Sequence, residues 1–203
     1  MKVELLHVTP DALAFIGKCA GICYNSSTDR EPSIRRAIGC KDKGHLATLR
    51  FAHATFHVSG ISRACSHQFV RSKHLDFLQR SQRYCSEKET EFIYPPNLDE
   101  YSKAKLNFAY FSALSDYNTL ISQGVKKEDA RFVLPEATET ELIVTGNLQA
   151  WLDFVKLRAD KHAQFEIRCV AHKINNILAN ECNGLFNWMP DIYEQTMEQQ
   201  KMG

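Results

Sequence analysis

The stretch RFAHATFHVSG, residues 50–60, decides the fold class of this chain. Small or apolar side chains alternate in it with Thr55 and His57, and the alternating set is Ala52, Ala54, Phe56 and Val58. A period of two residues is typical of a β-strand that buries one face. We therefore expect a strand that ends at Gly60.

The rest of the chain alternates between strand and helix patterns. KVELLHV (2–8) and TETELIVTGN (138–147) are predicted strands, and TEFIYPP (90–96) is a short strand closed by two prolines. Helices are predicted at residues 10–24, within 25–44, and at 61–71, 99–123, 126–134, 148–159, 162–182 and 184–198. No internal repeat or linker interrupts them, so the prediction is a single α+β domain over residues 1–203.

The composition excludes several classes of protein. The chain has 203 residues, a formal net charge of +1 and 44% hydrophobic residues, which suits one globular domain. The sequence has no run of about 18 apolar residues, so no membrane span is predicted. The first residues lack the layout of a signal peptide. The near-neutral charge argues against a nucleic-acid surface. Seven scattered cysteines without zinc-ligand spacing indicate free thiols, so we expect a cytoplasmic protein.

Polar donors concentrate in RSKHLDFLQRSQRYC, residues 71–85. Residues 61–85 carry five cations and one acid, and on a helix Arg63, His67 and Arg71 would share a face, opposite Cys65 and Phe69. Arginine forks match phosphate and carbonyl groups, and serine and glutamine supply orienting hydrogen bonds. Two interpretations stay open: a site for a phosphorylated polar small molecule, or a solvated basic surface.

Other chemistries find little support in the sequence. It contains no glycine-rich phosphate loop and no GxSxG nucleophile elbow. His162 and Glu166 lie four residues apart on a predicted helix, but the second histidine of a zinc-protease helix is missing, so a local helix-face pair is expected. His53 and His57 would share a strand face without a third metal ligand.

Four motifs together resemble one known family. GISRACSHQFVR, QRSQRY, RFVLPEATETELIVTGN and LRADKHAQFEIR have the order and spacing found in the flavin-dependent thymidylate synthases, and the resemblance runs from about residue 14 to 182. It implies a subunit with a central, mostly antiparallel sheet and flanking helices, assembled as a homotetramer with active sites between chains. It also implies methylation of dUMP, with methylenetetrahydrofolate as carbon donor and FAD reduced by NADPH as hydride source.

The resemblance also assigns residues. Arg158 would be catalytic, because a guanidinium favours negative charge developing on the pyrimidine ring, so that no enzyme nucleophile is needed. The residues implied around dUMP are Gln68, Phe69, Val70, Arg71, Gln79, Arg80, Ser81, Gln82, Arg83, Arg131 and Arg158, with Ser81, Arg83 and Arg131 at its phosphate. Those implied around FAD are Arg71, Ser72, Lys73, Gln79, Asn147, Gln149, Asp153 and His162.

The chain departs from the family pattern mainly on the flavin side. Ser72 and Lys73 stand where the family has His-Arg, and Gln149 stands where a basic residue is expected. Farther upstream, a hydroxyl, a carboxylate and an imidazole are replaced by Ala47, Arg50 and Phe51. Three interpretations follow: a working enzyme with a remodelled flavin site, in which Arg50 offsets a lost cation; a related enzyme that hydroxymethylates or takes another pyrimidine; or a non-catalytic nucleotide-binding protein.

Overall fold

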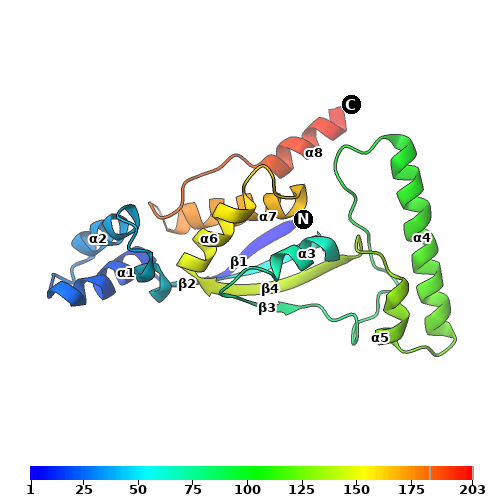
Figure 1. Ribbon diagram of the computed structural model, residues 1–203, viewed down its shortest axis with the longest axis horizontal. Helices are drawn as coiled ribbons and strands as arrows, with labels where there is room; N and C mark the ends of the chain where they lie inside the picture. Colours follow the sequence, from blue (N-terminus) through cyan, green and yellow to red (C-terminus); the bar gives the residue numbers. More distant parts are fainter. Residues whose placement is uncertain (183, 203) are drawn as a thin grey trace.

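The computed structural model describes residues 1–182 and 184–202. Four strands form its sheet: β1 (Lys2–Val8), β2 (His53–Ser62), β3 (Leu75–Gln79) and β4 (Glu139–Asn147). Their order is β1-β2-β4-β3 and every neighbouring pair is antiparallel (Figure 1). This confirms the predicted α+β class and the antiparallel sheet.

The alternation that predicted β2 is present in the structure. Its inward side chains, including Phe56 and Val58, are fully buried, while Thr55 and His57 on the other face are half-buried. The predicted end at Gly60 is two residues short. Gly60 has a positive φ of 67°, where the register with β4 shifts, and the strand resumes through Ile61 and Ser62.

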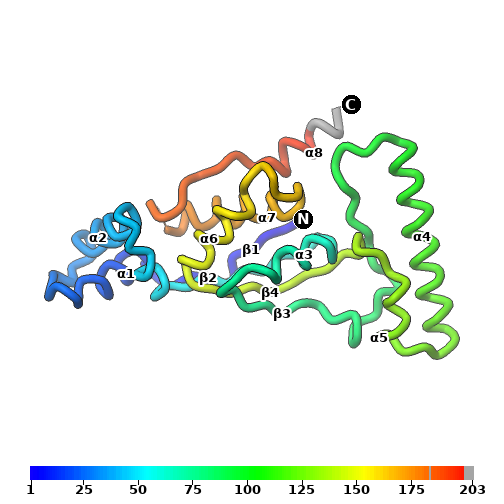
Figure 2. Tube along the Cα trace, viewed as in Figure 1, coloured from blue at the N-terminus to red at the C-terminus, as the bar shows by residue number. Residues whose placement is uncertain are grey.

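The helices and short 3-10 turns surround the sheet. The helices are α1 (Ala12–Gly21), α2 (Arg30–Asp42), α3 (Arg63–Phe69), α4 (Glu100–Ser122), α5 (Lys127–Ala130), α6 (Leu148–Arg158), α7 (Phe165–Glu181) and α8 (Ile192–Met202). The 3-10 turns are η1 (Ile22–Tyr24), η2 (Leu46–Phe51) and η3 (Arg131–Val133). Helices α3, α6 and α7 lie over one face of the sheet (Figure 1), and the tube in Figure 2 shows α1 and α2 at one end of the molecule and α4 and α5 at the other.

Several predicted elements differ from the structure. Residues 75–79, for which no element was expected, form the edge strand β3, and TEFIYPP forms only a bridge between Phe92 and Thr138. The first residues of RFAHATFHVSG belong to η2 rather than to a strand. Helix α8 starts at Ile192 instead of 184, because the preceding segment binds α7 through bonds such as Asn176 Nδ2 to Met189 O, 2.7 Å.

Aromatic packing between the sheet and α6 makes the centre of the core. Phe56 of β2 meets Trp151 edge-on at 5.0 Å, and Trp151 Nε1 donates to Ala54 O at 3.0 Å. Phe69 at the end of α3 stacks on Phe154 of α6 at 4.7 Å. These contacts fix the C-terminal end of α3 against α6. Over the described ranges, the structure contains no helix with the length and apolarity needed to span a bilayer.

Candidate functional site

The loop after β3 carries the densest group of predicted nucleotide ligands. Gln79, the last residue of β3, donates from Nε2 to Ser66 Oγ at 2.8 Å and to Thr140 Oγ1 at 3.2 Å. Ser81 then closes a turn, since its carbonyl accepts from Cys85 N at 2.8 Å and its Oγ accepts from Arg83 N at 3.2 Å. The loop is therefore held by its own backbone, with Arg83 exposed beside it.

Arg83 and Arg131 both contact Glu128. Arg83 Nε lies 2.5 Å from Glu128 Oε2, and Arg131 Nε donates to Glu128 O at 3.1 Å. Arg131 is the first residue of η3 and follows α5 directly, so α5 sets the position of both guanidinium groups. Two residues predicted to bind the same phosphate are thus neighbours, although 48 positions separate them in the sequence.

A basic pocket of about 400 Å³ opens between α3 and η3. We use this name for the cavity whose polar lining consists of Arg63, His67, Gln82, Arg131 and Glu136. Phe132, Leu134 and Pro135 form its apolar wall. Gln82 and Arg131 were predicted nucleotide ligands, whereas Arg63 and His67 were noted only as members of a basic helix face.

The loop after β3 also carries a buried carboxylate. Glu87 is 1% exposed, its Oε1 lies 3.8 Å from Arg80 Nε, and its backbone N donates to Tyr117 Oη at 3.2 Å. Burial raises the pKa of Glu87 above its usual value, while Arg80 and Arg63 oppose the shift. The loop that carries the predicted phosphate ligands is therefore tied to α4 at one end and to β3 at the other.

Arg158 ends α6 and reaches the C-terminal end of α3. Its Nη2 donates to Gln68 O at 3.0 Å, and its Nε is buried without a hydrogen-bond partner among the described residues. Asp160, two residues farther along, pairs with His162 Nδ1 at 2.7 Å. The structure thus brings together two predicted residues, Arg158 and Gln68.

The residues after Gln68 have different environments. Phe69 is fully buried in the core, so its predicted contact with a nucleotide does not involve a free side chain. Arg71 lies beyond the end of α3, which corrects the predicted helix face shared with Arg63 and His67. Arg71 and Lys73 are exposed, and neither has an ion-pair partner within the described part of the chain. The Ser72 hydroxyl is buried and, within the same residues, has no hydrogen-bond partner.

Two predicted flavin residues at the N-terminal end of α6 are already bonded within the protein. Asn147 caps α6, with Oδ1 accepting from Ala150 N at 2.9 Å. Gln149 Oε1 accepts from Arg50 Nε at 2.7 Å, so two positions that depart from the family pattern contact each other. Asp153 is exposed on the same helix. Ala47 and Phe51 are exposed in η2, which also contains Arg50.

The predicted pair of His162 and Glu166 is wrong. His162 precedes α7, whereas Glu166 turns into the core and accepts from Ser62 N and Ser62 Oγ, both at 2.6 Å. Ser62 Oγ also accepts from Cys65 N at 3.0 Å, so Ser62 caps the N-terminus of α3. Burial raises the pKa of Glu166, and the bonds from Ser62 oppose that shift. Sequence spacing held no signal for this long-range pair.

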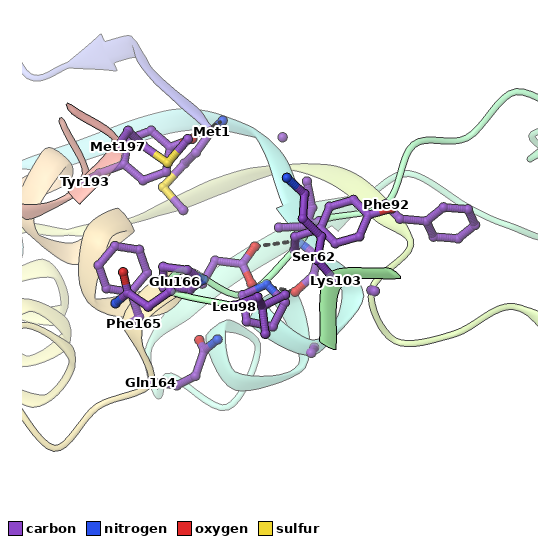
Figure 3. Close-up of a pocket in the computed structure, with 18 of the residues that line it drawn as sticks. Met1, Ser62, Phe92, Leu98, Lys103, Gln164, Phe165, Glu166, Tyr193 and Met197 are labelled. Atoms are coloured by element: carbon purple, nitrogen blue, oxygen red, sulfur yellow. Dashed lines mark hydrogen bonds between the residues drawn. The ribbon is translucent and has the colours of Figure 1, made fainter. Parts of the chain in front are cut away.

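Another cavity, of about 670 Å³, has none of the predicted site residues in its lining. Ser62 and Glu166 lie at its centre, with Tyr193 and Met197 on one side and Phe92 and Lys103 on the other (Figure 3). Its lining is mainly aromatic and apolar and does not contain a convergent set of donors. Elsewhere, His57 Nε2 binds Glu141 Oε2 at 2.9 Å, and within residues 1–182 and 184–202 no three metal-ligating side chains converge.

The family model and the similar proteins that match this chain agree on one family. The family model described as thymidylate synthase complementing protein matches residues 4–182. A flavin-dependent thymidylate synthase of Geobacter sulfurreducens is 38% identical over 185 residues, which cover 84% of this chain and 79% of that protein. The Mycobacterium tuberculosis H37Rv protein of the same name is 33% identical over 183 residues, covering 80% and 72%.

A solved structure shows the same fold. Thymidylate Synthase X from Helicobacter pylori, crystallised with FAD and dUMP, superposes with a TM-score of 0.76 over 92% of this chain and 98% of that one, at 22% sequence identity. The match to the family model extends over most of the described residues and includes most of β1 and all of β2 to β4 and α1 to α7. The chain therefore belongs to the thymidylate synthase complementing protein family.

Proposed function

We propose that this protein converts dUMP to dTMP by reductive methylation. The observation that carries the proposal is the Arg158 guanidinium, which is anchored at Gln68 O while its buried Nε has no partner among the described residues. A buried donor on a fixed cation is suited to a ligand group that carries or develops negative charge. The basic pocket, with Gln82 and Arg131, supplies a second cationic site suited to a phosphate.

The chemistry needs negative charge on the pyrimidine ring rather than an enzyme nucleophile. Burial raises the pKa of Cys169 and Cys182 to about 12 and shifts that of Cys65 farther upward, so these thiols are poor nucleophiles at neutral pH. A guanidinium at the ring favours the electron-rich form that attacks the one-carbon donor through ring carbon 5. We assign this role to Arg158, with Gln68 holding its position.

The overall reaction balances with the proposed co-substrates. Carbon 5 of dUMP gains a bond to the methylene carbon of methylenetetrahydrofolate and loses its proton to water. Both bonds from that methylene carbon to folate nitrogens break, and the two nitrogens take up protons from water. FAD, reduced by NADPH, would supply the hydride that completes the methyl group. The products are dTMP, tetrahydrofolate and NADP⁺.

The positive charges of the residues present suit the diphosphate of a flavin dinucleotide. Arg71 and Lys73 are exposed cations without ion-pair partners within residues 1–182 and 184–202, and Arg50 adds a third cation beside Gln149. Such cations would hold the diphosphate of FAD. Asn147, Gln149, Asp153 and His162 would complete the contacts, the first two from the N-terminal end of α6.

We propose a homotetramer in which each active site combines residues of different subunits. Arg63 and Gln68 lie near opposite ends of α3, whose seven residues extend about 10 Å, so the basic pocket and the Arg158 guanidinium are separated within one chain. Tyr101, Phe108 and Phe111 on α4 are exposed aromatic side chains that a subunit interface would cover. The seven free thiols support a reducing, cytoplasmic setting.

A second outcome is favoured by one specific feature of the flavin side. Gln149 and Arg50 bind each other, and a buried serine hydroxyl stands at position 72. If these changes prevent hydride delivery, transfer of the one-carbon unit would stop at a hydroxymethyl product. The remaining alternatives are that the protein takes another pyrimidine or that it only binds the nucleotide.

The test is release of tritium from carbon 5 of labelled dUMP. With methylenetetrahydrofolate, FAD and NADPH, the proposal predicts that the label is released to water and that the yellow FAD-loaded protein bleaches with NADPH. A protein that cannot be loaded with FAD, or that retains all label under these conditions, contradicts it. Release that needs folate but no flavin favours the hydroxymethyl alternative.

A further inference from the structure

A buried histidine of α7, His172, lies between two backbone carbonyl groups. Its Nδ1 is 2.9 Å from Pro190 O, and its Nε2 is 3.3 Å from Ala159 O. The residue is only 9% exposed, so water has little access to either contact. A carbonyl oxygen only accepts hydrogen bonds, and a neutral imidazole donates through one nitrogen alone. Both contacts are therefore hydrogen bonds only when the ring is protonated to imidazolium.

The first carbonyl belongs to the turn that follows Arg158. Ala159 is the C-cap of α6 and comes directly after the arginine to which we assign stabilisation of the pyrimidine ring. A second side chain of α7, Arg168, lies one turn before His172 and donates from Nη1 to Lys161 O at 2.9 Å. Helix α7 thus holds two carbonyl groups of the turn between α6 and α7.

The second carbonyl belongs to the segment between α7 and α8, residues 184–191, which turns back along α7 (Figure 1). Two further side chains of α7 hold this segment: Asn176 Nδ2 donates to Met189 O at 2.7 Å, and Lys173 Nζ lies 2.8 Å from Asp191 Oδ2. The match to the family model ends at residue 182, so it gives the segment no role. The same imidazole therefore joins this segment to the end of α6.

The carboxylates near the imidazole are already paired with other residues. The charged residues next to the three bonded positions are Arg158, Asp160, Lys173 and Asp191. Asp191 pairs with Lys173 at 2.8 Å, and Asp160 pairs with His162 at 2.7 Å. Within residues 1–182 and 184–202, His172 takes part in no ion pair. Loss of the ring proton therefore removes one of the two hydrogen bonds, and no ion pair compensates for it.

We propose that His172 is a positioning residue whose imidazolium form clamps the turn after Arg158 to the segment between α7 and α8. We call its two hydrogen bonds the histidine clamp. The proposal rests on the proposed function, because Arg158 is the residue that the clamp positions. An imidazole gains and loses its proton near neutral pH, and a small displacement of a catalytic group lowers the rate strongly. Turnover of dUMP is therefore expected to fall as pH rises and the clamp opens.

Two substitutions separate the two halves of the clamp. In His172→Asn the amide nitrogen takes the place of Nδ1, so the bond to Pro190 O is kept and Ala159 O is released. In His172→Gln the amide nitrogen takes the place of Nε2, so the bond to Ala159 O is kept and Pro190 O is released. Neither amide titrates, so the pH dependence of the clamp should disappear in both variants. His7→Asn, at an exposed position of β1, is the matched control.

Amide hydrogen exchange of the full chain measures each half of the clamp without any ligand. In His172→Asn, residues 159–163 should exchange about tenfold faster and residues 187–194 less than about twofold faster, and His172→Gln should show the reverse. In the wild type, nitrogen NMR should show both ring nitrogens of His172 protonated at about pH 5.5 and one at about pH 8. His7→Asn should change neither region.

A merely structural role of His172 has a different signature. Both variants would then loosen the two regions equally, and this result overturns the clamp, as does a wild-type ring with one protonated nitrogen at about pH 5.5. If His172→Asn does not fold, His172→Gln and the wild-type NMR spectrum decide.

Turnover tests whether the clamp positions Arg158. At about pH 6, kcat for dTMP formation should fall about tenfold or more in His172→Asn and stay within about threefold of the wild type in His172→Gln. An unchanged kcat in His172→Asn, together with faster exchange of residues 159–163, overturns the positioning role. If the wild type forms no dTMP at any pH, the proposed function fails, whereas hydrogen exchange and NMR still decide whether the clamp exists.

Discussion

The candidate site has a predicted phosphate end and a predicted flavin end. They differ in whether their polar side chains are already bonded within the protein. At the phosphate end, which is the basic pocket, Arg63 and Arg131 keep donors uncommitted within the described residues. At the flavin end, comprising η2, the start of α6 and the turn before α7, Gln149 is bound by Arg50 and His162 by Asp160. The basic pocket therefore keeps free cationic donors, whereas these residues of the flavin end are already bonded. Arg71 and Lys73, which are also predicted flavin contacts, are the exception, because they are exposed and have no ion-pair partner in the described residues.

This difference predicts how each ligand binds. A phosphate entering the basic pocket finds its donors in place and loses little free energy to reorganisation. A flavin would have to exchange existing bonds, such as the 2.7 Å bond between Arg50 and Gln149, for new ones of similar strength. The nucleotide side should therefore bind its ligand more readily than the flavin side does, and substitutions at four positions can break or sharpen this contrast.

The largest effect is expected from Arg158→Ala. Removing the guanidinium leaves the ring charge without its cation, so kcat should fall about a thousandfold or more, while the fold is retained because the residue ends α6 and is not part of the core. Steady-state dTMP formation measures the rate, and circular dichroism checks the fold. Lys156→Ala, exposed on the same helix, should keep near-normal rates. Near-normal turnover in Arg158→Ala would show that the residue has another role.

Glu166 tests the scaffold that both ends share. Glu166→Ala leaves Ser62 N–H and O–H buried without their acceptor, so the free energy of unfolding should fall by about 3 kcal/mol. Urea denaturation measures this loss, and Glu181→Ala, exposed on α7, is the control. A loss below about 1 kcal/mol would mean that α3 does not depend on this contact.

The same residue makes a prediction about pH. Because burial raises the folded-state pKa of Glu166 above the usual 4.5, its contribution to stability is complete below that value and is lost as pH rises through the raised pKa. Glu166→Gln cannot ionise, so its stability should decline less than that of the wild type between about pH 4.5 and neutrality. Identical slopes of unfolding free energy against pH in the two proteins would contradict this.

Arg50→Ala tests the flavin end alone. If Arg50 supplies a cation for the FAD diphosphate, its removal should raise the Kd for FAD about tenfold and leave the Kd for dUMP unchanged. Flavin absorbance during titration measures the first constant, with Arg35→Ala as the control. Tighter FAD binding in Arg50→Ala would instead mean that the bond to Gln149 opposes the cofactor.

The smallest effect is expected at Asn147. Asn147→Ala removes the cap of α6 and should cost about 1 kcal/mol of stability, whereas Asn147→Asp keeps an acceptor for Ala150 N and should cost less. Thermal denaturation compares the two variants. If both weaken FAD binding but only the alanine variant is destabilised, the side chain serves the cofactor as well as the helix.

Local patterns predicted the elements but not the contacts between them. The period of two in β2 and β4 is encoded within a few residues, and the structure confirms both strands. Strand β3 was missed because LDFLQ is short and lies among charged residues, and its pairing with β4 is what makes it a strand. Its neighbours in sequence gave no sign of that pairing.

The candidate site shows the same limit. The motifs identified Arg131 and Gln82, but Arg63 and His67 enter the pocket only because η3 folds back onto α3. The contact between Arg50 and Gln149 joins residues 99 positions apart, and neither neighbourhood signals it. Long-range contacts of this kind depend on tertiary packing, which periodicity and capping rules do not describe.

The most direct test of the proposed chemistry is the mass of the product. Wild-type protein is incubated with dUMP, methylenetetrahydrofolate, FAD and NADPH, and the nucleotide is analysed by mass spectrometry. The proposal predicts dTMP, with a methyl group on ring carbon 5. A hydroxymethyl nucleotide would contradict it by showing that the flavin end does not deliver hydride, and unchanged dUMP would contradict it by showing that the phosphate end serves binding alone.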